Sequence, residues 1–145
     1  MDPAIQLLRD LIAIDSVNPS LVPGAAGEAT VAERIAVALE AAGLDVRVTE
    51  VAQGRPNVVG VLEGRAPGRA LMLCGHMDTV GVEGMRAPFD PVQRGDRLYG
   101  RGAQDMKGGL AIILASLTAL EQIEAWQQVG YDVMINADEE TGSLS

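Results

Sequence analysis

Apolar residues recur with a helical period in three stretches of the chain. The first follows Asp2 and Pro3, which are typical of a helix N-cap and of the first helical position. The spacing of its apolar residues predicts an amphipathic helix. These residues are Ile5, Leu7, Leu8, Leu11 and Ile12. A second helix is predicted over residues 28–42, where Gly43 would end it. The third is predicted over residues 107–128.

Elsewhere the apolar period is that of strands. Residues 44–51 alternate between apolar and charged positions, which predicts a half-exposed strand. A second strand is expected over residues 57–62, after a turn at 54–56. Residues 70–74 form a continuous apolar run, which suggests a strand buried on both faces. Residues 131–137 predict another apolar strand.

Strands that alternate with helices predict an α/β fold. We expect a three-layer sandwich with a mixed, largely parallel sheet, and loop-rich connections over residues 17–27 and 75–102. The length of 145 residues fits one domain. Hydrophobic residues make up 48% of the chain but aromatic residues only 3%, so the core must be built from aliphatic side chains.

The charge and the cysteine content limit the possible binding partners and the cellular compartment. The formal net charge of −9 argues against binding to nucleic acid, whose phosphates need clustered Lys and Arg. Cys74 is the only cysteine, so no intrachain disulfide can form and a reducing compartment is expected. No signal peptide and no membrane-spanning apolar run is recognised, so we expect a cytoplasmic protein without a membrane partner.

Three polar clusters lie at element ends, where the active sites of open α/β sheets gather. The first is GHMDTV at residues 75–80, directly after the run 70–74. His76 is the only histidine of the chain, and a lone histidine is more often a core or surface residue than a ligand. Asp78 lies on the same side of an extended segment, and it could accept the second N–H of a metal-binding imidazole.

The second cluster is YGRGAQDMKGG at residues 99–109, at the entry to the last helix. Glycines before a helix can bind phosphate, but the pattern GxxxxGK[ST] and the third glycine of the dinucleotide motif are absent. An acidic residue, Asp105, also lies where a phosphate would bind. Asp105 alone would equally fit a helix N-cap.

The third cluster is NADEETGS at residues 136–143, after the last strand. Adjacent acids are costly to bury unless a cation lies between them. In an extended segment, Glu139 and Glu140 would project to opposite sides, so that one could bind a metal ion while the other faces a water molecule. A solvated, charged turn is the alternative.

Together these motifs resemble the superfamily of acetylornithine deacetylase, succinyl-diaminopimelate desuccinylase, aminoacylase and glutamate carboxypeptidase. The resemblance rests on GHMDTV, on GRG with DMKGG, and on DEETGS, in this order, and it extends to the first helix and to SVNP at residues 16–19. It implies that residues 1–145 are the N-terminal portion of a zinc-peptidase catalytic domain. The lid or dimerisation domain and the C-terminal catalytic part of that superfamily are absent from this sequence.

Residue by residue, the resemblance implies a centre of two zinc ions, which cobalt or manganese could replace. His76 would bind one ion, Asp105 would bridge both, and Glu140 would bind the second. Glu139 would be the general base, and Asp78 would orient His76. Two metal ions about 3.5–4 Å apart can share a carboxylate and lower the pKa of a bound water, whose proton Glu139 would pass to the leaving amine.

The implied function is hydrolysis of the amide bond in N-acyl amino acids or small peptides, by a full-length protein that forms a homo-oligomer. Relatives often have a cis peptide after the bridging aspartate, which predicts one between Asp105 and Met106. A further acidic ligand and a second histidine of the superfamily are not in this sequence. Each zinc ion would therefore keep only two protein ligands here, and the chain by itself is expected to be inactive.

Two other classes of protein fit parts of the pattern. A non-catalytic α/β binding module, degenerate or truncated, would gain little from adjacent acids, whereas a hydrolase needs a base at Glu139. A nucleotide-binding domain would use the glycines around Gly100, but that segment is acidic and lacks the motif.

Overall fold

The computed structural model describes residues 2–123 and 126–142. Its α-helices are α1 (Pro3–Ala13), α2 (Ala29–Ala41) and α3 (Gly108–Glu121). Its strands are β1 (Asp45–Ala52), β2 (Arg55–Leu62), β3 (Leu71–His76), β4 (Val92–Arg94), β5 (Arg97–Tyr99) and β6 (Tyr131–Asn136). Short turns of helix are η1 (Ala103–Lys107), η2 (Trp126–Gln128) and η3 (Glu139–Thr141). No helix in the described part of the chain is long and apolar enough to cross a membrane.

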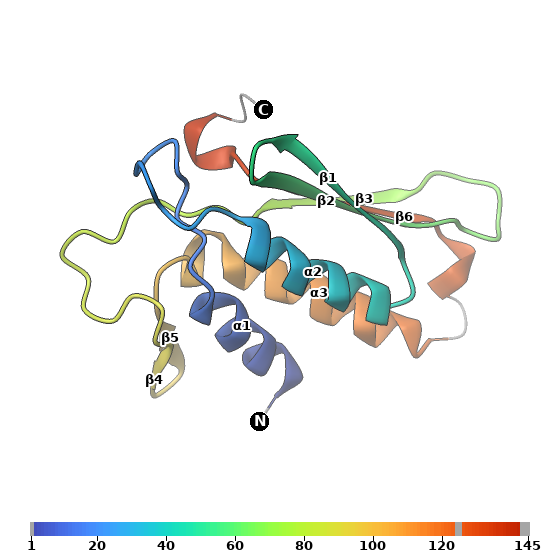
Figure 1. Cartoon of the computed structure of the whole chain (residues 1–145). Coiled ribbons are helices and arrows are strands. Elements are labelled where there is room, and N and C mark those ends of the chain that lie inside the picture. The colour runs from blue at the N-terminus through green and yellow to red at the C-terminus, as the bar shows by residue number, and fades with distance from the viewer. Residues whose placement is uncertain (1, 124–125, 143–145) are drawn as a thin grey trace.

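The main sheet has the strand order β1-β2-β6-β3 (Figure 1). The predicted α/β class with a mixed sheet is confirmed, because β3 pairs with β6 in parallel while β1–β2 and β2–β6 are antiparallel. The expected majority of parallel pairings is not found among the described strands. The reason is local: a tight turn at Gly54 joins β1 to β2, and a short turn of this kind can only join antiparallel strands.

The helices lie on one side of the main sheet (Figure 1), so the described residues form two layers and not the expected three. The prediction that residues 70–74 form a strand buried on both faces is therefore wrong. Leu71 and Met72 are 51% and 60% exposed. Within residues 2–123 and 126–142, β3 is the last strand in the sheet order, it pairs only with β6, and no helix lies against one of its faces.

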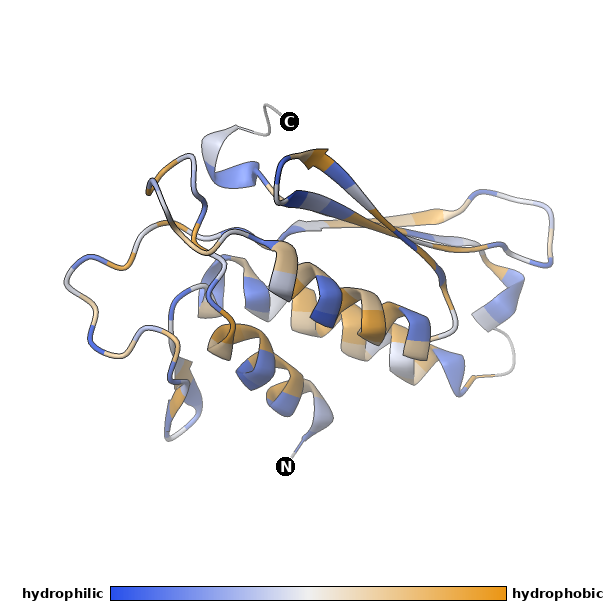
Figure 2. Cartoon of the chain, in the orientation of Figure 1, coloured by the Kyte–Doolittle hydropathy of each residue, from blue (hydrophilic) through white to orange (hydrophobic). Residues whose placement is uncertain are grey.

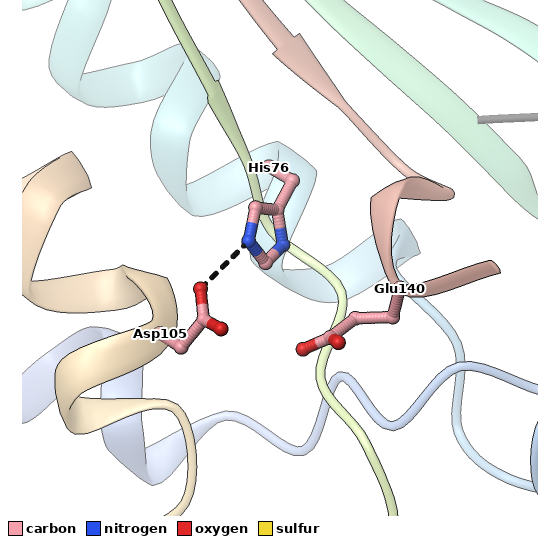
Figure 3. Close-up of side chains that lie close together, drawn as sticks. All are labelled: His76, Asp105 and Glu140. Carbon is pink, nitrogen blue, oxygen red and sulfur yellow. Dashed lines mark hydrogen bonds and ion pairs between the residues drawn. The ribbon is translucent and has the colours of Figure 1, made fainter. Parts of the chain in front are cut away.

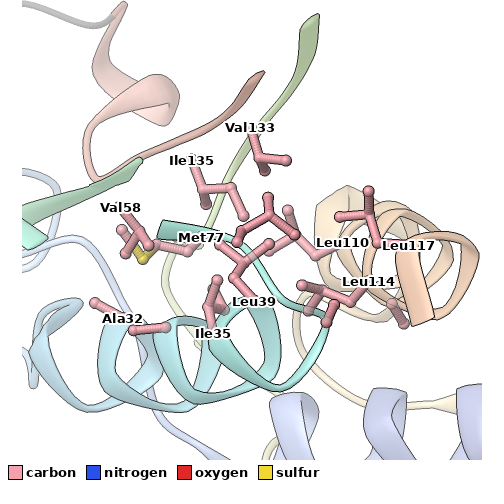
Figure 4. Packing of buried hydrophobic residues seen from close by; sticks show 14 of the residues in the cluster. Ala32, Ile35, Leu39, Val58, Met77, Leu110, Leu114, Leu117, Val133 and Ile135 are labelled. Atoms are coloured by element: carbon pink, nitrogen blue, oxygen red, sulfur yellow. The ribbon is translucent and has the colours of Figure 1, made fainter. Parts of the chain in front are cut away.

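The core lies between this sheet and the helices (Figure 4). Figure 2 shows hydrophobic residues along the strands and helices and hydrophilic residues in many of the connections. The core side chains that meet there come from α2, α3 and the two central strands and include Ile35, Leu39, Val58, Leu110, Leu114, Val133 and Ile135. As expected from the composition, the packing is mainly aliphatic.

The helix boundaries follow the predicted signals closely at α1 and α2. Asp2 accepts a hydrogen bond from the amide of Ala4 at 2.8 Å, as a capping residue should. Gly43 has φ of 82°, the left-handed conformation that ends a helix after its C-cap.

The last predicted helix differs at both ends. Instead of beginning at residue 107, α3 begins at Gly108 after the kinked segment η1. Instead of reaching residue 128, it ends at Glu121, although residues 124–125 lie outside the described part. Beyond α3, Trp126 lies in η2, is 5% exposed, and has its ring centroid 5.5 Å from that of Tyr131.

Gly102, directly before η1, is expected to tolerate no side chain. Its φ is 75°, and a Cβ atom there would lie 2.8 Å from Thr79 Cγ2. We expect Gly102→Ala to lower the free energy of unfolding by more than the about 1–2 kcal/mol that a left-handed conformation alone costs. Gly24→Ala is the control, because Gly24 has φ of 82° and open space around it. Equal losses for both variants in urea unfolding would show that the close approach to Thr79 is unimportant.

Candidate metal centre

His76 is the last residue of β3 and lies between two carboxylates. Its Nδ1 is 3.2 Å from Asp78 Oδ1, and its Nε2 is 3.0 Å from Asp105 Oδ1. The side chain is buried, and Figure 3 shows the ring facing Asp105. Asp78 thus lies at the ring nitrogen that points away from Asp105, which is the arrangement that orients an imidazole for binding a metal ion.

Asp105 lies within η1, at the point where the backbone departs from helical geometry, at Asp105 and Met106. The peptide bond between Asp105 and Met106 is cis, as the family resemblance predicted. The interpretation of Asp105 as a helix N-cap is wrong, because Lys107 is the residue that precedes α3 and no side chain caps this end. The carboxylate of Asp105 instead projects, 73% exposed, towards His76.

Glu139 and Glu140 lie in the helical turn η3 and not in an extended segment. The expectation that they project to opposite sides therefore fails, because successive side chains are about 120° apart in a 3₁₀ turn and about 180° apart in a strand. Glu139 Oε2 is 3.7 Å from His76 Nε2, and Glu140 points towards the same place (Figure 3). Their backbone amides both donate to Asp78, at 3.2 and 3.1 Å.

Three side chains from separate parts of the sequence therefore converge. His76, Asp105 and Glu140 each offer a ligand atom, and these atoms lie within 4.8 Å of one another. Asp105 and Glu140 also line an open hollow of about 450 Å³. A space of this size is large enough for a small molecule beside the three side chains.

The acidic surroundings change the ionisation of these groups. Burial and the negative charge of Asp105 raise the pKa of Glu140. Burial alone would lower the pKa of His76, but its hydrogen bonds to Asp78 and Asp105 raise it to about 9. The shift of Glu140 favours its neutral, protonated form, and the shift of His76 favours the protonated imidazole.

The donor set fits a divalent metal ion of the zinc type. Zinc is bound in proteins by imidazole nitrogen and carboxylate oxygen, commonly from three or four ligands. Among the described residues this cluster supplies three ligands, one imidazole and two carboxylates. Two ions would need further ligands.

Sequence reasoning missed a second set of polar residues behind this cluster. Arg55 was assigned to the turn before the second predicted strand, but it is the first residue of β2 and is buried. Asn18 was noticed only as part of SVNP, yet its side chain is fully buried and bonds to Asp78. Lys107 was placed at the start of a helix, but its fully buried ammonium group donates to the carbonyl of Ile14 at 2.7 Å. A buried cation has no distinct signal in a single sequence.

Glu28, which pairs with Arg55, makes part of the stability depend on pH. Its Oε2 accepts from Arg55 Nε at 2.6 Å, while its Oε1 has no partner among the described residues. Burial raises the pKa of Glu28 from 4.5 to about 7, although Arg55 lowers it. The folded chain thus holds this proton more tightly than the unfolded chain. The resulting stabilisation is complete below pH about 4.5 and is lost as the pH rises through about 7.

In Glu28→Gln this loss should disappear. We expect the difference in unfolding free energy between wild type and variant to change by up to about 1.4 kcal/mol per pH unit inside that window, in favour of the variant at higher pH. Urea unfolding at several pH values measures the difference. A difference that stays constant from pH 4.5 to 7 would contradict the assignment.

Comparison with known proteins identifies the family of this chain. Residues 72–145 match the family described as "Peptidase family M20/M25/M40", which is about half of the chain. The chain belongs to peptidase family M20/M25/M40. The matched residues include His76, Asp105, Glu139 and Glu140 of this chain. The resemblance stated from the three motifs is therefore confirmed.

Relatives of this M20 chain carry the names of deacetylases and peptidases. An acetylornithine deacetylase of Photorhabdus laumondii is 33% identical over 97% of the chain and 37% of its own length. Carboxypeptidase G2 of a Pseudomonas strain is 43% identical over 61% of the chain and 21% of its own length. The M20 chain thus spans little more than a third, or less, of the relatives it matches.

Solved structures share the fold of the M20 chain. Human carnosine dipeptidase 1 superposes with a TM-score of 0.75 at 22% identity, over 99% of the chain and 33% of its own length. A Bacillus subtilis protein is described as a dinuclear metal binding peptidase from the M20 family. It has a TM-score of 0.60 at 18% identity, over 91% of this chain and 33% of its own length. At these identities, the likeness supports the fold alone.

Proposed function

We propose that the chain is the N-terminal portion of the catalytic domain of a longer protein, called here the full-length protein. That protein would be a hydrolase using two zinc ions to cleave the amide bond of N-acyl amino acids or small peptides. The convergence of His76, Asp105 and Glu140, with ligand atoms within 4.8 Å of one another, carries the proposal. The names of its relatives, deacetylase and carboxypeptidase, support the substrate class.

In this proposal each side chain has a distinct role. His76 and Glu140 would each hold one metal ion, and Asp105, the most exposed of the three, would bridge both. Asp78 would orient His76 through Nδ1, from a distance of 3.2 Å. Bound there, the metal ions would lower the pKa of a water molecule and polarise the amide carbonyl. Cobalt or manganese, with similar ligand preferences, could take their place.

Glu139 would transfer a proton from the attacking water molecule to the leaving nitrogen. Its carboxylate is 55% exposed and lies 3.7 Å from His76 Nε2, so it borders the proposed site without being buried in it. As the water oxygen attacks the carbonyl carbon, Glu139 would accept one proton. When the C–N bond breaks, it would return that proton to the leaving nitrogen, which gives an amine and a carboxylic acid.

Metal dependence of hydrolysis by the full-length protein tests this function. We expect release of free amino acid from N-acetylated amino acids or dipeptides to stop on dialysis against a chelator and to return when zinc is added. Hydrolysis that survives complete metal removal would refute the metal mechanism. Absence of hydrolysis of all such amides, with zinc bound, would instead favour a non-catalytic binding module.

The 145-residue chain alone is expected to bind zinc weakly and to show negligible turnover, because its described cluster offers three ligands where two ions need more. Isothermal titration with zinc and an assay on N-acetylated amino acids, run beside the full-length protein, measure both. Tight binding of two ions together with rapid hydrolysis by the chain alone would contradict this expectation.

A further inference from the structure

A buried guanidinium lies behind the turn that carries Glu139 and Glu140. Arg55 is 7% exposed and donates to four residues that are distant in the sequence: Ser20, to whose Oγ its Nη1 donates at 3.0 Å, Glu28, Ala137 and Asp138. Its Nε donates to Glu28 at 2.6 Å, and its Nη2 donates to Asp138 Oδ1 at 2.9 Å and to the carbonyl of Ala137 at 2.6 Å. Arg55 thus holds the two residues that lead from β6 into η3.

Asn18 connects this pair to the proposed metal site. Its side chain is 0% exposed, and its single amide nitrogen donates to two carboxylates, Asp138 Oδ1 at 3.0 Å and Asp78 Oδ2 at 2.7 Å. Its Oδ1 accepts from the amide of Ser20 at 2.8 Å, which fixes the orientation of the side-chain amide. Two buried carboxylates that would otherwise repel each other are therefore bridged by one neutral donor.

Asp78 contacts both His76 and the turn that carries Glu139 and Glu140. One of its oxygens lies at His76 Nδ1 and accepts from the amide of Glu139, and the other accepts from the amide of Glu140. The placement of the imidazole and that of the two acids consequently depend on one carboxylate.

We propose that Arg55 and Asn18 are positioning residues for the proposed metal site: they fix the turn carrying Glu139 and Glu140 against Asp78, and through Asp78 against His76. The inference rests on the proposed function, and it adds residues that act only through others. Neither side chain is placed to reach a substrate, since Asn18 is fully buried and Arg55 nearly so. Their effect should fall on kcat and on metal affinity and not on KM.

The test compares three variants of the full-length protein. Asn18→Ala removes the bridging donor, and Arg55→Lys keeps the charge but loses the planar fork that reaches several acceptors at once. The control is Arg34→Met, which breaks the partly exposed ion pair between Arg34 and Asp10, 3.1 Å apart on α2 and α1. We expect Asn18→Ala and Arg55→Lys each to lower kcat and zinc affinity by about 10–100-fold, with KM within about threefold of wild type. Arg34→Met should leave all three quantities unchanged.

A readout independent of activity separates positioning from the proposed function. In the 145-residue chain, hydrogen exchange by NMR should be faster at the amides of Glu139 and Glu140 in Asn18→Ala than in wild type. Unchanged exchange, or wild-type kcat and zinc affinity in both variants, would overturn the inference. So would loss of folding in both variants, since a general structural role would then explain the network. If wild type has no metal-dependent hydrolysis, the proposed function fails, and exchange alone decides the positioning role.

Discussion

Replacing Glu139 with glutamine is expected to lower the kcat of the full-length protein by about 10²–10⁴-fold, the usual contribution of a general acid–base group. Glutamine has nearly the same shape but cannot take up the proton of the attacking water. Zinc content should be unchanged, because the ligand atoms that cluster together come from His76, Asp105 and Glu140. Steady-state kinetics together with metal analysis of the purified variant measure the two effects separately.

The matched control is Glu33→Gln, which makes the same change on the exposed side of α2 and should leave kcat at the wild-type value. If Glu139→Gln keeps full turnover, Glu139 is not the base. If it loses zinc as well as turnover, Glu139 serves as a ligand, and its role has to be exchanged with that of Glu140.

Replacing Asp105 with asparagine is expected to weaken zinc binding by more than about 100-fold and to reduce hydrolysis to background. Loss of a group that merely orients a ligand already costs about 10–100-fold, and Asp105 is proposed to be shared by both ions. Asparagine keeps the size of the side chain, but it removes the charge and replaces one carboxylate oxygen with an amide nitrogen that cannot bind a metal ion in its place. Competition with a chelating dye measures the affinity, and the amide assay measures the turnover.

Asp96→Asn provides the control for this change, because Asp96 lies in the exposed turn between β4 and β5. It should bind zinc and turn over substrate as the wild type does. Retention of both metal ions in Asp105→Asn would contradict the bridging role and would require another residue to hold the ions together.

Local signals were sufficient for those parts of the fold that short-range interactions determine. Asp2 and Gly43 mark helix ends through capping geometry, which depends on neighbouring residues only. The apolar run at 70–74 was correctly recognised as a strand, but its burial was not. Burial depends on where the strand lies in the sheet and on what covers its faces, and an apolar run carries no information on either.

The candidate site shows the same division. His76, Asp105 and Glu140 were predicted as ligands because the motifs that contain them resemble those of the superfamily, and the structure brings their ligand atoms together. Arg55 and Asn18 were not assigned a role, because their importance comes from contacts with residues up to 120 positions away along the chain. Such contacts become visible only in three dimensions.

X-ray diffraction at the zinc absorption edge tests the central claim most directly, on crystals of the full-length protein grown with zinc. The account predicts anomalous scattering peaks within about 2.0–2.2 Å of His76 Nε2 and of carboxylate oxygens of Asp105 and Glu140. Zinc bound only elsewhere, with these three side chains free of metal, would contradict it.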